Sequence, residues 1–557
     1  MEPVSLPQDI LLLLCQELAT RRDFATLYQC ALVGRRMASI SVEQLYRIRD
    51  VADAFPDDKL DTACLWRSIV LSSIGATAYP YAAYVRALSL GQLEECLEDM
   101  RGDKDLRDYF FQGPMQPFQV LRDGFQVPKK QLRNTPRLPP LDVSKTLCKC
   151  ADSITTYIRE VADDNGTAVA LAHLEGYYIP HDILPKWITR LGTLTSLRLR
   201  DGSVLGLEAA RAIVECCPNF CDLTCYYYQS GSADEDMAAF FQTLRPNSLQ
   251  KFEVLSRNQI AEHTLTALNA HAESLKALVL RSLAPLAMKN LNLLSQCISL
   301  ETLLIENDGH DKVWLKDFSA GLLKEIAKWI SNCKQLRDLT FTHVLDALTI
   351  LKDVLNCTDI HLTSLRVKDF QEISDDVTQA TWRALGQQEH LQHLTLAELD
   401  GVPDGLVLAR HRQLIDSICA LENLDDLNLI EASVASPEIR RFSRYLPNLT
   451  SLSFGGDLVD DSILDAFSAF PKLNSVSINA TSVFRFESLQ TFAQSLDPIK
   501  HAGISFDILN QWYETRLTDD EEHWLKQYFV NTLDGSISIT YPSGPDEMHE
   551  GDFSESD

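Results

Sequence analysis

Four cysteines lie close together in the sequence, at the spacing of a possible zinc site. They are Cys216, Cys217, Cys221 and Cys225, and a structural zinc ion needs four ligands that converge as a tetrahedron. However, Cys216 and Cys217 end a segment of helical pattern just before Pro218, and Cys225 takes an apolar position in a strand pattern. Small buried thiols are common at such places, so we expect packing and predict no metal site.

A second candidate for chemistry is the histidine pair in HLQH, His390 and His393. It lies on a turn that enters a predicted strand, where we expect surface exposure or packing. The sequence has no glycine-rich phosphate loop, no G-x-S-x-G elbow and no H-E-x-x-H motif. We therefore predict that the protein is not an enzyme and uses no catalytic residue or cofactor. An active site dispersed over the sequence without a motif is the alternative.

The composition limits the partners and the compartment. The chain has 557 residues, of which 45% are hydrophobic and 23% charged, and a formal net charge of −27. Such a chain repels nucleic acid phosphates and anionic membranes, so we predict neither as a partner. Fourteen cysteines are scattered without the density of a secreted disulfide scaffold. We expect reduced thiols and a cytoplasmic or nuclear location, or both.

The apolar run ILLLLC near the N-terminus is not expected to be a signal peptide. Glu2 and Asp9 precede it, and no basic segment does. No apolar stretch of the sequence reaches the roughly 18 residues of a membrane span.

One motif recurs along most of the chain. LTSLRLRD at 194–201 returns as LTSLRVKD at 362–369 and in part as LTSLSFGG at 449–456. The underlying pattern is L-x-x-L-x-L with other apolar residues allowed. It begins twelve times between Leu194 and Ile499, at a mean interval of about 28 residues, as in leucine-rich repeats. Chance could place one such motif, but not twelve in register.

Helical patterns fill the intervals between these motifs, as in GLLKEIAKWISNC at 321–333. Each repeat is thus predicted to form a strand, a turn and a helix, and stacked repeats bury an apolar ribbon that one repeat could not bury alone. Strands lie about 4.8 Å apart, and helices need more room. The predicted fold is α/β, a leucine-rich-repeat horseshoe solenoid of the ribonuclease-inhibitor type, with its strands on the concave side.

Side chains between the core positions of each strand are expected to face the concave side. Arginine and tyrosine are frequent there, and both are common anchors of interfaces. We hypothesise that this row binds an acidic or phosphorylated target segment; an ordinary solvated sheet face is the competing interpretation. The predicted target-binding residues are Arg198, Arg200, Tyr226, Tyr228, Lys251, Glu253, Arg281, Arg366 and Lys368.

A different pattern precedes the repeats, in residues 6–47. Pro7 suits the first turn of a helix, and apolar residues follow it at helical spacing as far as Leu18. A second stripe contains Phe24 and Leu27, and a short third helix ends the segment. Three helices in about 45 residues do not easily bury a self-sufficient core, so a leftover stripe is expected to dock on a partner's helices. A cap on the solenoid is the alternative.

Residues 6–47 resemble an F-box. That family's pattern opens with Leu-Pro, an acidic residue and an aliphatic helix, and its second helix ends in valine and a basic residue. Segments 65–99 and 109–119 resemble the linker of F-box/leucine-rich-repeat proteins of filamentous fungi, so the resemblance covers most of the chain. The matching F-box residues are Leu6, Pro7, Asp9, Ile10, Leu18, Leu27, Val33, Arg35 and Arg36, while Met37 stands where the family usually has tryptophan.

This resemblance implies a substrate-recognition subunit of a Skp1–cullin–F-box ubiquitin ligase. The F-box would bind a Skp1-type adaptor and through it a cullin, and the repeats would bind an unknown target for proteasomal degradation. The chain would act by raising the local concentration of target lysines near a ubiquitin-conjugating enzyme. A leucine-rich-repeat interaction scaffold without ligase coupling is the runner-up. The implied adaptor-binding residues are Leu6, Pro7, Ile10, Leu11, Leu14, Leu18, Leu27 and Val33.

The predicted organisation has four parts. Residues 1–50 form the F-box-like module, and 51–160 a linker region with helices, an imperfect first repeat strand in YVRALSL and a basic, proline-rich loop. Residues 161–542 form the solenoid, which ends with a helix and the strand SISITY. In 543–557 there are six acidic residues and no basic one, so we expect disorder.

Overall fold

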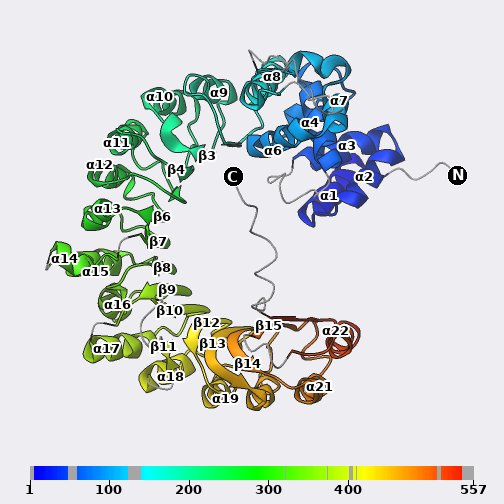
Figure 1. The fold of residues 1–557 in the computed structure, drawn as a ribbon. Helices are drawn as coiled ribbons and strands as arrows, with labels where there is room; N and C mark the ends of the chain where they lie inside the picture. Colours follow the sequence, from blue (N-terminus) through cyan, green and yellow to red (C-terminus); the bar gives the residue numbers. More distant parts are fainter. Residues whose placement is uncertain are drawn as a thin grey trace, which may run out of the picture. The chain divides into compact units, whose positions relative to one another are not determined.

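Parallel strands followed by helices make up most of the structure, a computed structural model. It describes residues 6–47, 59–122, 140–310, 312–319, 321–372, 374–399, 406–408, 411–510 and 516–541. The chain divides into two units, Met1–Ser274 and Leu275–Asp557. In the repeats of each unit, a parallel sheet lies on one side and the repeat helices lie on the other (Figure 1). The predicted α/β leucine-rich-repeat fold is confirmed.

The first unit begins with the predicted helical module. Its helices are α1 (Gln8–Thr20), α2 (Phe24–Val33) and α3 (Arg35–Tyr46). Pro7 stands just before α1, and the Asp23 side chain accepts a hydrogen bond from the backbone N–H of Thr26 at 3.0 Å, which caps α2. The helices that follow are α4 (Lys59–Ser73), α5 (Tyr81–Tyr84), α6 (Leu90–Gly102), α7 (Lys104–Phe111), the 3-10 helix η2 (Gly113–Phe118) and α8 (Val143–Asp164).

The repeats of the first unit pair in chain order. The strands are β1 (Ala87–Ser89), β2 (His173–Gly176), β3 (Ser196–Asp201), β4 (Asp222–Tyr227) and β5 (Lys251–Val254). Behind them lie α9 (Leu184–Leu191), α10 (Leu207–Cys216), α11 (Ala233–Thr243) and α12 (Glu262–Ala267), with short 3-10 turns at 202–204 and 268–271. The predicted boundary after residue 160 falls inside α8, and β1 is the predicted imperfect strand.

Strand β2 is a repeat that the sequence analysis missed. Leu171 and Leu174 occupy its first two core positions, but the third is Gly176. A Cβ atom on Gly176 would lie 2.4 Å from Cδ1 of Ile179, so the Ile179 side chain fills the place of the missing one. The core position is filled from outside the strand, which is why the L-x-x-L-x-L pattern is not visible here.

The second unit repeats the same arrangement. Its strands are β6 (Ala277–Leu283), β7 (Thr302–Asn307), β8 (Asp338–Thr342), β9 (Ser364–Phe370), β10 (His393–Glu398), β11 (Leu406–Val407), β12 (Asp426–Ser433), β13 (Ser451–Asp460), β14 (Ser475–Val483), β15 (Ser505–Asn510) and β16 (Ser536–Thr540). Its helices are α13 (Pro285–Lys289), α14 (Leu315–Phe318), α15 (Leu322–Asn332), α16 (Ala347–Leu355), α17 (Asp375–Leu385), α18 (Arg412–Cys419), α19 (Ser436–Tyr445), α20 (Leu464–Phe467), α21 (Phe486–Ser495) and α22 (Asp519–Leu533), with 3-10 turns at 291–294 and 461–463.

Equivalent core residues of neighbouring strands stand side by side in each unit. In the first unit Leu197 pairs with Leu223, which pairs with Phe252. In the second, the corresponding ladder is Leu278, Leu303, Leu339, Leu365, Leu394, Leu427, Leu452, Val476, Phe506 and Ile537. These side chains are buried. Burial of a side chain of this size stabilises the fold by about 1.5–3 kcal/mol, which makes the register the main determinant of the fold.

The closing helix and strand predicted for the C-terminal end are confirmed as α22 and β16. Residues 113–118 of the predicted basic loop form η2 instead of an irregular loop, while 123–139 and the predicted acidic tail from Ser543 lie outside the described residues. Within the described ranges, no helix has both the length and the apolar composition needed to cross a membrane.

The last predicted motif was placed four residues too early. Ser505 pairs with Ser475 and Phe506 with Val476, so the motif of β15 begins at Gly503 and not at Ile499. Gly503 has φ of +83°, which suits glycine and bends the chain into the strand. Ile499 lies in the preceding turn and is 90% exposed.

The corrected frame predicts different effects for two apolar substitutions. Phe506→Ala removes a fully buried ring from the ladder, so we expect the free energy of unfolding of the second unit to fall by about 3–5 kcal/mol. Ile499→Ala removes an exposed side chain and should change it by less than about 0.5 kcal/mol. Urea unfolding followed by circular dichroism measures both, and a larger effect at Ile499 would show that the frame begins there after all.

Candidate functional site

Large apolar side chains on the first two helices form the first candidate site. Ile10 and Leu14, at i and i+4 on α1, are 46% and 43% exposed, and Val33 at the end of α2 is 80% exposed. Apolar side chains are usually buried, so a group of exposed ones is a candidate docking surface. We define the α1–α2 apolar surface as Leu6, Pro7, Ile10, Leu13, Leu14, Tyr28, Leu32 and Val33.

Three of the implied adaptor-binding residues do not belong to this surface. Leu27 is 0% exposed and forms the core of the module with Cys15 and Ile40. Leu11 and Leu18 are partly buried against the same core. The inward side of α2 must pack on α1 and α3, and Leu27 lies on that side. Its assignment to the adaptor surface is therefore wrong.

Three exposed residues of the surface were missed, namely Leu13, Leu32 and Tyr28. Leu13 belongs to the run ILLLL, which offers an apolar residue to every side of the helix. The sequence alone therefore did not show which leucines face inward. Met37, at the usual tryptophan position of the F-box pattern, packs against the module core.

Helix α3 attaches the module to the rest of the first unit. The ring of Tyr46 stacks on that of Tyr81 with 4.7 Å between centroids, and its hydroxyl is 2.8 Å from Oγ of Ser68. Burial raises the pKa of Tyr46 to about 12. This attachment uses the end of α3 and leaves the α1–α2 apolar surface uncovered within the described chain.

The second candidate site is the outward face of the sheet of the first unit. Strand register places Ser89, Glu175, Arg198, Thr224 and Glu253 in one row across β1–β5. The neighbouring row holds His173, Ser196, Asp222 and Lys251. We call these two rows the β1–β5 face.

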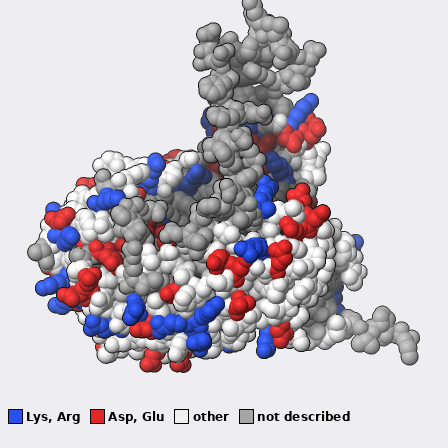
Figure 2. Space-filling view, turned by 60° about the horizontal axis from the view of Figure 1, so that its bottom comes forward, with Lys and Arg blue, Asp and Glu red and all other residues white. Residues whose placement is uncertain are grey.

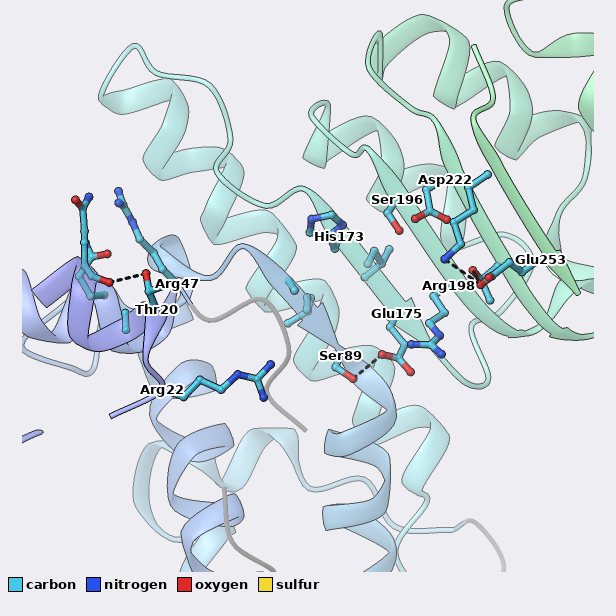
Figure 3. Close-up of a pocket in the computed structure, with 18 residues that line it drawn as sticks. Thr20, Arg22, Arg47, Ser89, His173, Glu175, Ser196, Arg198, Asp222 and Glu253 are labelled. Carbon is cyan, nitrogen blue, oxygen red and sulfur yellow. Dashed lines mark hydrogen bonds and ion pairs between the residues drawn. The ribbon is translucent and has the colours of Figure 1, made fainter. Parts of the chain in front are cut away.

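A cavity of ≈ 940 Å³ lies between this face and the helical module. Its module side includes Gln44, Arg47 and Arg22, and its sheet side includes His173, Arg198 and Lys251. Figure 3 shows Arg22 pointing from the α1–α2 turn toward the sheet. An occupant of the cavity would therefore touch both the module and the repeats.

Several charges of the face neutralise one another. Glu253 accepts a hydrogen bond from the Thr224 hydroxyl at 3.0 Å and forms an ion pair with Lys251 at 3.1 Å. Glu175 accepts a hydrogen bond from the Ser89 hydroxyl at 3.0 Å (Figure 3). Lys251 and Glu253, both predicted to bind a target, thus hold each other in place, and they offer a partner less charge than their residue types suggest.

Arginines of β3 lie beside tyrosine rings. Cζ of Arg198 is 5.2 Å from the ring centroid of Tyr226, and Cζ of Arg200 is 4.9 Å from that of Tyr177. Arg198, Arg200 and Tyr226 therefore lie together, as the hypothesis of a target-binding row requires. Tyr177 was not among the predicted residues, although it follows β2, the strand whose repeat was missed.

Tyr228 does not face outward, contrary to the prediction. Its side chain is 1% exposed, because β4 ends at Tyr227 and the alternation of side chains ends with it. The backbone N–H of Tyr228 donates a hydrogen bond to the carbonyl of Arg257. The Tyr228 ring packs against Gly202 so closely that a Cβ atom on this glycine would lie 2.4 Å from Cδ2 of the ring.

The predicted target-binding residues of the second unit differ in their surroundings. Arg281 forms an ion pair with Glu306 on the next strand, with 3.0 Å between Nη1 and Oε2. Arg366 and Lys368 of β9 are exposed. Of these three, only the two residues on β9 present an exposed positive charge that no ion pair within the described structure neutralises.

Two of the four cysteines, Cys217 and Cys225, are buried as expected of packing residues, while Cys216 and Cys221 are partly exposed. Cys225 lies in the core beside Gly202, and burial raises the pKa of its thiol. Burial also raises the pKa of Cys217 to about 11. A search of the described residues finds no group of three or more His, Cys, Asp or Glu placed to hold a metal ion. His393 lies 4.0 Å from the carboxylate of Asp426, and His390 meets the ring of His361 edge-on.

Charges of both signs are mixed on the surface drawn in Figure 2, where lysine and arginine lie among aspartate and glutamate. The net charge of −27 is therefore not spread as one uniform acidic field over that face.

The chain was compared with known proteins. No family model matches the sequence, and no curated protein matches it. Its structure is similar to one described as "Crystal structure of Rad7 and Elc1 complex in yeast", with 17% identity, a TM-score of 0.36, and coverage of 60% of this chain and 90% of that chain.

Two further solved structures are similar at the same level. Toll, in the Toll–Spatzle complex of Drosophila, has 15% identity and a TM-score of 0.35; the match covers 69% of this chain and 50% of that one, so this chain spans about half of its length. Human 5T4 has 15% identity and a TM-score of 0.28, with 50% of this chain and 88% of that chain covered.

The placement of Leu27 and Val33 predicts a large loss of module stability for one substitution and almost none for the other. Leu27→Ala empties part of its core, so we expect a loss of about 2–5 kcal/mol and faster amide exchange in residues 8–46. Val33→Ala should change the stability by less than about 0.5 kcal/mol. Hydrogen–deuterium exchange with mass spectrometry measures both, and equal exchange in the two variants would contradict this placement.

Proposed function

We propose that the protein is a non-enzymatic substrate receptor of a Skp1–cullin–F-box ubiquitin ligase. The α1–α2 apolar surface would bind a Skp1-type adaptor and through it a cullin, and outward faces of the repeats would bind a target protein. The single observation that carries the proposal is the exposed apolar surface on α1 and α2 of a module whose sequence resembles an F-box.

The arrangement of the three helices supports docking over a simple capping role. A cap would turn its apolar residues toward the solenoid and its polar residues outward. Here α3 makes the attachment through Tyr46, while Ile10, Leu14 and Val33 remain outward. Full burial of one such side chain contributes about 1.5–3 kcal/mol, so a few of them suffice for a specific interface.

The proposed role requires no reacting group on the chain itself. An adaptor on α1–α2 and a target on the repeats would belong to one assembly, so transfer of ubiquitin to the target would become effectively intramolecular. We further propose that this takes place in the cytoplasm or nucleus. The fourteen cysteines are all free, which fits a reducing compartment.

A pull-down with purified Skp1 tests the adaptor role. We expect the intact chain to be retained, and the Ile10→Asp, Leu14→Asp double variant to lose at least about tenfold in affinity. The reason is that two carboxylates would be buried in the interface without partners.

Leu286→Asp is the matched control, because Leu286 is an exposed leucine on α13 of the second unit, 59% exposed. It should bind Skp1 like the unchanged chain. No binding by the unchanged chain would favour the runner-up, a leucine-rich-repeat scaffold without ligase coupling. Undiminished binding by the double variant would show that the adaptor uses another surface.

A further inference from the structure

Two arginines of β3 lie on the outward side of the first unit's sheet without an ionic partner in the described chain. Arg198 and Arg200 are two residues apart on one strand, so their side chains leave the same face about 6.6 Å apart. The Nε of Arg198 is buried and has no hydrogen-bond acceptor among the described residues. Arg281 and Lys251, by contrast, are each paired with a glutamate.

Tyrosine rings orient both guanidinium groups. Tyr226 lies beside Arg198, and Arg200 lies near two rings, with 4.9 Å from its Cζ to the centroid of Tyr177 and 5.9 Å to that of Tyr178. A guanidinium on an aromatic face keeps its N–H groups available in its own plane. In that plane it binds carboxylates or phosphates through two parallel hydrogen bonds. The two arginines are thus preorganised for anions.

Tyr177 is held in place by helix α6. A Cβ atom on Gly91 would lie 2.5 Å from Cε1 of Tyr177, so the ring occupies space that only glycine leaves open. Tyr177 is therefore a positioning residue for Arg200, and its ring, not its hydroxyl, does the positioning.

Two acidic residues near the arginines do not neutralise them directly. Glu175 is next to Arg198 in register (Figure 3), but its carboxylate accepts from Ser89 and forms no ion pair with Arg198 in the described structure. Glu94 of α6 is buried; burial, together with Glu98, raises the pKa of its carboxyl, and the charge of Arg200 opposes that rise.

We propose that Arg198 and Arg200 bind an extended segment of a target protein that carries anionic side chains two residues apart, in the pattern acid-x-acid. In a segment extended along β3, side chains i and i+2 are also about 6.6 Å apart, so each anion meets one guanidinium. Glutamate, aspartate and phosphoserine share this chemistry. The inference rests on the proposed function, since it gives a target class to a face that the proposed receptor would use.

Peptide binding to the full-length chain, without adaptor, tests the spacing. Labelled peptides carrying Glu-Gly-Glu or phosphoserine-Gly-phosphoserine between glycine–serine flanks are titrated by fluorescence anisotropy at low ionic strength. We expect at least one of them to bind about tenfold or more tightly than a peptide with the two glutamates adjacent or with Gln-Gly-Gln. Whichever of the two acidic peptides binds more tightly shows whether the target's anionic groups are carboxylates or phosphates.

Single substitutions then test each contact. Arg198→Gln and Arg200→Gln should each weaken binding about tenfold or more, while the control Arg281→Gln should not, because Glu306 already neutralises that arginine. Tyr177→Phe should retain peptide binding and Tyr177→Leu should lose it. The pair of variants distinguishes orientation of Arg200 by the aromatic ring from a role of the Tyr177 hydroxyl. Circular dichroism verifies the fold of each variant.

Several results would overturn the proposal. One is equal affinity for the separated and adjacent glutamates; another is unchanged affinity in both arginine variants. Two acid-x-acid pairs of the chain's own C-terminal residues, Glu550 with Asp552 and Glu555 with Asp557, are a competing occupant. If changing these four to their amides tightens peptide binding more than tenfold, the site belongs to the tail and not to a target. Skp1 binding is measured separately, so failure of one assay leaves the other interpretable.

Discussion

Stacking of equivalent core side chains, one repeat beneath the next, is the constraint on which the rest of the structure depends. Leu197, Leu223 and Phe252 can share one buried ladder only if their strands pair without a shift. A shift of one residue would turn every core side chain outward. The same register decides which residues reach the outward face, so the positions of Arg198 and Arg200 are a consequence of how Leu197 and Leu199 pack.

That constraint explains which parts of the fold could be predicted from the sequence. Eleven of the twelve predicted motif frames agree with observed strands, because an apolar residue at each core position leaves a visible pattern. The pattern failed at two places. At Gly176 the side chain of Ile179 fills the core position, and in β15 the motif begins with Gly503 in place of an apolar side chain. A sequence pattern does not show that a residue from outside the motif fills one of its core positions.

The candidate sites were predictable only in part, for related reasons. Alternation along a strand correctly predicted that Arg198, Arg200 and Tyr226 face outward but failed at Tyr228, where the strand ends. It also gave no information about pairing, so Arg281 was predicted to bind a target although it forms an ion pair with Glu306. In the module, the run of leucines on α1 concealed which side was inward, and Leu27 was assigned to the wrong side of α2.

The contact between Tyr46 and Tyr81 has a mechanical consequence. The module is joined to the rest of the first unit by the stacked rings of Tyr46 and Tyr81 and by the hydroxyl pair of Tyr46 and Ser68, and not only by the chain between them. A protein bound to α1 and α2 would then be held at a fixed orientation to the repeats of the first unit, and not at the end of a flexible linker. Under the proposed function, only a narrow region of a bound substrate would then reach the ubiquitin-conjugating enzyme. The position at which the substrate binds the repeats would therefore determine which of its lysines is modified.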